Sequence, residues 1–188
     1  MFLTCHKRTK SIMTFIFLMI CCSAIGFCSE SCRKGDIYKD TQNRFEVICP
    51  AEKMDVDSYG VYFEDEKNFS SYLIREYDAP PLRRNVALSI SNVLSDIKSM
   101  MASQSKIDVL KEEAFIYQGH EAINFDFKYQ QEPPIYYYTR LIKTDNFVLW
   151  IYLSMPSGPE AVIITNESEA TIASDIANKF FESLKVLK

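Results

Sequence analysis

The strongest constraint on the fold is a series of short segments in which apolar and polar residues alternate. In the clearest, residues 122–129, Ile, Phe, Phe and Tyr alternate with Asn, Asp and Lys. A period of two residues is typical of a strand with one buried face. The same reasoning predicts strands at 45–50, 60–63, 71–77, 114–117, 136–143 and 147–153. Because short polar turns join successive strands, we expect hairpins and an antiparallel sheet.

Two further segments carry apolar residues at steps of three and four, which predicts amphipathic helices. The first stripe is Val86, Ile90, Val93, Ile97 and Met100, widened by Leu94 and Met101. The second is Ile172, Ile176, Phe180, Leu184 and Leu187, and Asn166 with Glu169 resembles a capping box before it. Each helix has one apolar stripe, so each is expected to cover one face of the sheet. The predicted class is α+β, arranged as an α/β/α sandwich.

The N-terminus has the pattern of an export signal. A basic head (Lys7, Arg8 and Lys10) precedes an uncharged, largely apolar stretch over residues 11–28 that ends in small residues such as Ala24 and Gly26. This order is the signature of a secretory signal peptide. We expect a signal peptide over 1–26, with 28 as the latest end, then an N-terminal arm over 27–36 and one domain over 37–188.

Two other fates of this segment stay open. The uncharged stretch is slightly short for a membrane span, but an uncleaved anchor would also place the domain outside the cytoplasm. Lipidation at Cys21, Cys22 or Cys28 would do the same. All three alternatives export the domain, to the periplasm, the secreted space or the outer side of a membrane. Any contact with the membrane is expected through this segment alone.

Cysteine usage fits an oxidising compartment. Cys32 and Cys49 are candidates for a disulfide that ties the arm to the end of the first strand. The alternative is that Cys49 is a small buried apolar residue. Cys28, if it survives cleavage, could compete for the same partner.

Charge and glycine content exclude two partner classes. Removing residues 1–26 takes away three basic residues, which leaves 18 Lys and Arg against 25 Asp and Glu, a balance of −7. Nucleic acids are bound mainly through Lys and Arg, so no nucleic-acid partner is expected. The whole chain has five glycines and no phosphate-cradling loop, so no nucleotide is expected either.

The sequence offers no catalytic or cofactor motif. His120 is the single histidine beyond the signal segment, in a predicted turn, and no Gly-x-Ser-x-Gly motif accompanies it. The acidic groups Glu112–Glu113 and Glu64–Glu66 are interpreted as solvated turn and edge residues. Asp55, Asp57, Gly60 and Glu66 partly match a calcium-binding loop, but Tyr59 stands where an oxygen ligand is wanted. No catalytic residue, metal or cofactor is therefore predicted.

Several motifs together resemble the PsbP-like (Mog/PsbP-type) superfamily. They are Tyr38 with Phe45-x-Val47-x-x-Pro50, the hairpin 60–77, Gly119-x-x-Ala122-x-x-Phe125-x-Phe127, and the ending 180–186. The resemblance spans most of residues 37–188. It implies an antiparallel sheet flanked by helices and a non-catalytic binding scaffold. The export signal favours the uncharacterised bacterial exported branch.

The expected function is that of an exported, non-enzymatic module that binds a protein or a component of the cell envelope. A small secreted hydrolase using carboxylates or a cysteine is one alternative, and a secreted host-interacting factor is another. For a binding surface, the sequence singles out Tyr136, Tyr137 and Tyr138 beside the 132–134 loop. The competing interpretation of these tyrosines is packing of the strand beneath a helix.

Overall fold

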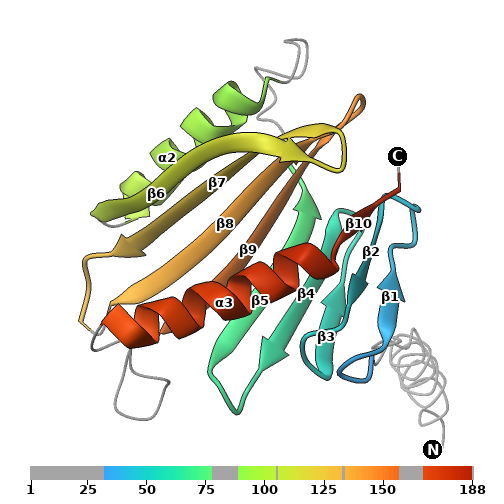
Figure 1. Cartoon of the computed structure of the whole chain (residues 1–188), viewed down its shortest axis with the longest axis horizontal. Helices are drawn as coiled ribbons and strands as arrows, with labels where there is room; N and C mark the ends of the chain where they lie inside the picture. The colour runs from blue at the N-terminus through green and yellow to red at the C-terminus, as the bar shows by residue number, and fades with distance from the viewer. Residues whose placement is uncertain (1–31, 78–88, 105, 133, 157–166, 188) are drawn as a thin grey trace, which may run out of the picture.

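The computed structural model describes residues 32–77, 89–104, 106–132, 134–156 and 167–187 (Figure 1). The expected signal segment, Val86 and the predicted cap residue Asn166 lie outside these ranges. In chain order the elements are β1 (Ile37–Lys39), β2 (Phe45–Ile48), β3 (Lys53–Val56), β4 (Gly60–Asp65), β5 (Ser70–Glu76), α2 (Ile90–Gln104), β6 (Ile107–Tyr117), β7 (His120–Tyr129), β8 (Ile135–Lys143), β9 (Val148–Pro156), α3 (Glu167–Ser183) and β10 (Lys185–Val186).

The main sheet is antiparallel throughout, as the hairpin pattern predicts. It has seven strands in the order β3-β4-β5-β9-β8-β7-β6. Hairpins join β4 to β5, β6 to β7, and β8 to β9, with Asp65 opposite Ser70 and Tyr117 opposite His120 at the turns. One longer connection runs from β5 through α2 to β6 at the far edge of the sheet. The chain then returns strand by strand, so that β9 lies beside β5 and Tyr72 faces Leu153.

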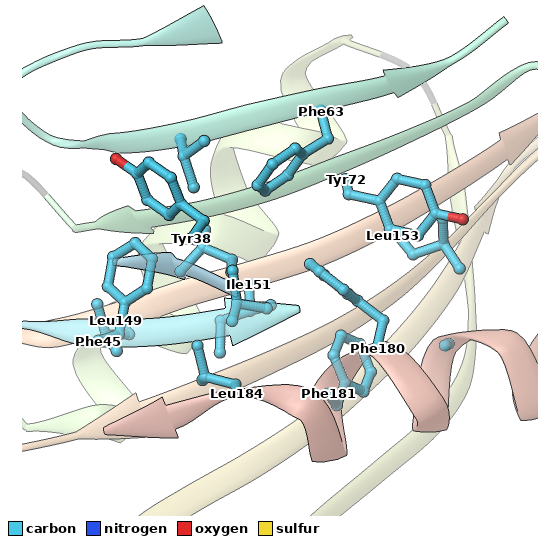
Figure 2. Packing of buried hydrophobic residues seen from close by; sticks show 14 of the residues in the cluster. Tyr38, Phe45, Phe63, Tyr72, Leu149, Ile151, Leu153, Phe180, Phe181 and Leu184 are labelled. Atoms are coloured by element: carbon cyan, nitrogen blue, oxygen red, sulfur yellow. The ribbon is translucent and has the colours of Figure 1, made fainter. Parts of the chain in front are cut away.

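The two described helices cover opposite faces of this sheet (Figure 1), which confirms the predicted α/β/α arrangement. Helix α2 begins after Ser89, whose hydroxyl accepts the N–H of Asn92 at 3.2 Å as an N-cap. Its stripe packs on alternate residues of β7, including the fully buried Phe125 and Phe127. Helix α3 packs on the other face, against residues of β5 and β9 such as Tyr72 and Leu153 (Figure 2).

A second, three-stranded sheet of order β1-β2-β10 closes the end of the α3 layer. Its inward residues Tyr38 and Phe45 join the same core as Phe180 and Leu184 (Figure 2). At the other side, the hydroxyl of Tyr117 lies 2.8 Å from the carbonyl oxygen of Phe181 and 2.7 Å from that of Leu184. The single hydroxyl proton of Tyr117 is thus shared between two carbonyls at the C-terminal end of α3, where a helix leaves carbonyls without intrahelical partners.

Three details of the helices and strands differ from the sequence expectations. Helix α3 ends at Ser183, so Leu184 and Leu187 lie beyond it, because residues 185–186 pair with β2 as strand β10. On α2, Met100 is 40 % exposed and Met101 makes the core contact. Strand β6 begins at Ile107, well before the predicted 114, since its polar first half is an exposed edge without alternation.

Candidate functional site

A groove of about 480 Å³ lies between α3 and the β4–β5 hairpin. Five parts of the chain form it: the arm before β1, the end of β2, the β4–β5 hairpin, the end of β9 and the exposed side of α3. Concave sites of this size, with an apolar floor and a few polar groups, are the usual location of ligand and peptide binding. We therefore treat this groove as the candidate functional site.

The floor of the groove is apolar. The ring of Tyr72 meets the edge of Phe180 with ring centres 4.9 Å apart (Figure 2), and Met155 and Ile176 extend the same surface. Burial, followed by the nearby Asp65 carboxylate, raises the pKa of the Tyr72 hydroxyl, so this group is neutral at physiological pH. At the open side, Ile48 is 46 % exposed.

The rim of the groove is charged. Lys34 comes from the arm and Lys179 from α3, while Asp65 closes the β4–β5 turn. The Nζ of Lys34 lies 3.5 Å from Oδ2 of Asp65. A second hollow of about 250 Å³ adjoins the groove, and both share this ion pair, which therefore lies at the border between them.

Asp65 is mainly a turn residue. Its Oδ1 accepts the backbone N–H groups of Lys67 and Asn68, and its Oδ2 accepts the Asn68 side-chain amide at 2.8 Å. Burial raises the pKa of this carboxyl, but the hydrogen bonds from Asn68 and the charge of Lys34 outweigh it and hold the pKa below its ordinary value. The sequence interpretation of Asp65 as a solvated residue was wrong, because its side chain is 8 % exposed.

The disulfide expected from the sequence is present and sets the position of the arm. Cys32 and Cys49 are joined with Cα atoms 6.3 Å apart. Beside it, the N–H of Gly35 donates to the backbone carbonyl of Cys49, and the N–H of Cys49 donates to the backbone carbonyl of Asp36. Gly35 has φ of +96°, a conformation that a residue with a Cβ rarely adopts, and this turn carries Lys34 to the groove.

The three tyrosines singled out from the sequence do not gather on one surface. Tyr136 and Tyr138 face α3, and Tyr138 is 6 % exposed, whereas Tyr137 packs in the α2 layer with its ring stacked on Phe127 at 4.9 Å. A binding role for them remains a prediction.

The groove residues were not singled out from the sequence, because no sequence motif unites segments that lie more than 100 residues apart.

The residues that the sequence analysis considered for catalysis or calcium binding do not form one cluster. His120 is at the start of β7, and the candidate calcium residues Asp57 and Glu66 lie at opposite ends of the β3–β4 hairpin. Asp57 accepts the N–H groups of Tyr59 and Gly60, which makes it a turn cap. Within the described ranges, no three His, Cys, Asp or Glu residues are close enough to hold a metal ion.

Asp126 is the one carboxylate in the described part of the chain whose pKa is strongly raised. It lies half-buried on β7 and accepts the backbone N–H of Thr139 at 3.2 Å. Burial raises its pKa to about 6, although that N–H and the charges of Lys111 and Arg140 act in the opposite direction. Across the strand pair, burial and this carboxylate raise the pKa of Tyr138 to about 12.

Comparison with solved structures decides the fold. Cyanobacterial PsbP (CyanoP) from Synechocystis sp. PCC 6803 aligns over 87 % of this chain and 99 % of its own length, with a TM-score of 0.54 and 16 % identity. This chain has a PsbP-like fold. PA94 from Pseudomonas aeruginosa, a protein of unknown function, aligns over 77 % of this chain and 93 % of its own, with a TM-score of 0.47 and 13 % identity.

The PsbP-like fold confirms the resemblance stated from the sequence motifs. At these identities the likeness concerns the fold alone. No protein-family profile matches the chain, and no curated protein matches it in sequence. Of the helices that the structure describes, none has the length and apolarity needed to cross a bilayer.

Proposed function

We propose that this protein is an exported, non-enzymatic binding module that contacts a protein or another component of the cell envelope through the groove beside α3. The observation that carries the proposal is the groove itself: a concavity of about 480 Å³ with an apolar lining, framed by charged residues from separate parts of the chain. A concave site lined mainly by apolar side chains, with a few polar groups at its edge, is the usual form of a binding site.

Two further observations support the proposal. A PsbP-like fold is shared with CyanoP, and the resemblance to that superfamily implies a binding scaffold rather than an enzyme. The Cys32–Cys49 disulfide is compatible with export, because disulfides persist in oxidising compartments and are rare in the cytosol. The branch of uncharacterised bacterial exported proteins remains the proposed relation within that superfamily.

Export is tested by mass spectrometry of the intact protein from the envelope fraction and from the medium of its native cells. The expected mass corresponds to a chain beginning after Gly26 with the Cys32–Cys49 disulfide formed. A mass that corresponds to a lipid-modified or an uncleaved chain would still agree with export, but it would mean that the N-terminal segment anchors the protein to the membrane. Full-length, reduced protein confined to the cytosol would contradict export.

Binding is tested by site-specific photocrosslinking in the native envelope. A photoreactive residue at Lys179 faces the groove, and the same residue at the exposed Asn178 provides a matched control on the same helix. The proposal expects a discrete adduct from position 179 that is absent from 178 and is lost when Ser183→Trp fills the groove. Equal adducts from both positions would contradict the assignment of the groove, and turnover of a substrate by the purified protein would contradict the non-enzymatic role.

A further inference from the structure

We infer that the groove binds an extended peptide segment in which apolar side chains alternate with carboxylates, and that Lys34 and Lys179 recognise those carboxylates. The inference rests on the proposed function and names the chemistry of the partner. Four observations carry it. They are the missing acidic partner of Lys179, the weak ion pair of Lys34, the ion pairs of lysines elsewhere on the protein, and the arrangement of apolar and polar groups along the groove.

Lys179 has no acidic partner among the described residues. On α3 it is three residues after Ile176 and immediately before Phe180. Its ammonium group therefore lies next to the apolar floor of the groove. No ion pair joins it to any residue that the structure describes. An incoming carboxylate would therefore gain a charge partner without displacing one.

Lys34 is engaged only weakly. Its contact with Asp65 is 3.5 Å long and its side chain is 62 % exposed, the setting in which ion pairs contribute little. Asp65 already accepts three hydrogen bonds within its turn, from Lys67 and Asn68. Lys34 can therefore turn to a partner's carboxylate while the Asp65 carboxylate stays hydrogen-bonded.

Several other lysines on this acidic protein form ion pairs with acids. Lys53, for example, lies 2.5 Å from Glu64, and Lys111 lies 2.8 Å from Glu113. The groove is thus a local reversal of the surface charge, with two lysines and one internally bonded aspartate on its rim. Complementary charge of this kind contributes mainly to specificity and to the rate of association.

The alternation of side chains follows from the shape of the groove. Tyr72, Phe180 and Ile176 form the floor, while the lysines stand at the rim, so a bound segment would send apolar side chains inward and acidic ones outward. An extended backbone separates its side chains in this way. The hydroxyl of Ser183 donates to the Phe180 carbonyl at 2.7 Å, and its oxygen can still accept a peptide N–H.

The test is isothermal titration calorimetry on the full mature chain with the disulfide formed. Three capped peptides serve as probes: leucine alternating with glutamate, with glutamine, or with lysine. The glutamate peptide should bind about tenfold or more tightly than the glutamine peptide, a difference that higher salt reduces. The Lys34→Gln/Lys179→Gln variant should lose this preference, whereas Lys111→Gln/Lys143→Gln, on β6 and β8 and not part of the groove, should keep it.

The outcomes separate this inference from the proposed function. Equal binding of the glutamate and glutamine peptides, abolished by Ser183→Trp but unaffected by the lysine variants, would overturn charge recognition and leave the groove as the binding site. Binding that Ser183→Trp does not change, or no binding of any peptide, would overturn the peptide assignment. The photocrosslinking from position 179 then decides independently whether the groove contacts a partner.

Discussion

Arg44 and Asp40 form a buried, two-pronged ion pair in the turn between β1 and β2. The Nε of Arg44 lies 2.8 Å from Oδ2 of Asp40, and its Nη2 lies 2.8 Å from Oδ1. A third guanidinium nitrogen, Nη1, lies 3.0 Å from Glu76 at the end of β5, and the Arg44 carbonyl accepts the N–H of Leu187. The pair therefore ties the small sheet to the main sheet and to the C-terminal strand.

Replacing Arg44 with methionine should destabilise the fold severely. The substitution leaves the Asp40 carboxylate, whose side chain is 1 % exposed, without its cation, and breaking a buried pair in this way costs about 3–5 kcal/mol. Urea denaturation followed by circular dichroism measures the change. Lys39→Met, which removes an exposed pair with Glu46, is the control and should cost about 1 kcal/mol or less. Equal losses for both variants would contradict the role assigned to Arg44.

The disulfide should stabilise the chain by about 3 kcal/mol, since it closes a loop with a separation of 17 residues. Cys32→Ser/Cys49→Ser should lower the free energy of unfolding by that amount in urea. A reducing agent should destabilise the wild type to the same extent and leave the double variant unchanged. A variant as stable as the oxidised wild type would show that the bond adds nothing to the fold.

The strands and helices of this fold follow largely from periodicity, because most of the sheet has alternate residues facing a helix. Residues 122–129 alternate because Phe125 and Phe127 face α2 while Asn124 and Asp126 face the other way. Strand β10 could not be predicted in this way. Leu184 and Leu187, on either side of it, continue the apolar spacing of α3, whereas Lys185 and Val186 pair with Glu46 and Phe45 of β2.

The candidate site was beyond the reach of sequence patterns for a different reason. Nothing in the sequence around Lys34, Asp65 or Lys179 sets these residues apart, and only the packing of α3 beside the β4–β5 hairpin places them around one groove. The cysteines are the exception. Their pairing was one of the alternatives that the sequence offered, because the chain has few cysteines beyond the signal segment and an expected oxidising destination, and the structure contains the bond.

The buried carboxyl of Asp126 should make the protein less stable as the pH rises from about 4 to about 6. Its folded pKa of about 6 lies above the ordinary value of 3.8, so the native state holds a proton that the unfolded state has released. Stability falls wherever the native state binds more protons. A shift of this size corresponds to a cost on the order of 2–3 kcal/mol, fully present above the folded pKa.

Asp126→Asn should remove this dependence, because the amide keeps an oxygen that can accept the Thr139 N–H and carries no charge. The variant should be more stable than the wild type by about 2–3 kcal/mol at pH 8 and nearly equal to it at pH 4. Urea denaturation at intervals across this range gives the difference curve, which should bend near pH 6. Asp145→Asn, in the exposed β8–β9 turn, is the matched control and should give a flat difference. An Asp126→Asn variant that is less stable at pH 8 than at pH 4, relative to the wild type, would mean that the ionised carboxylate is favoured in the folded protein.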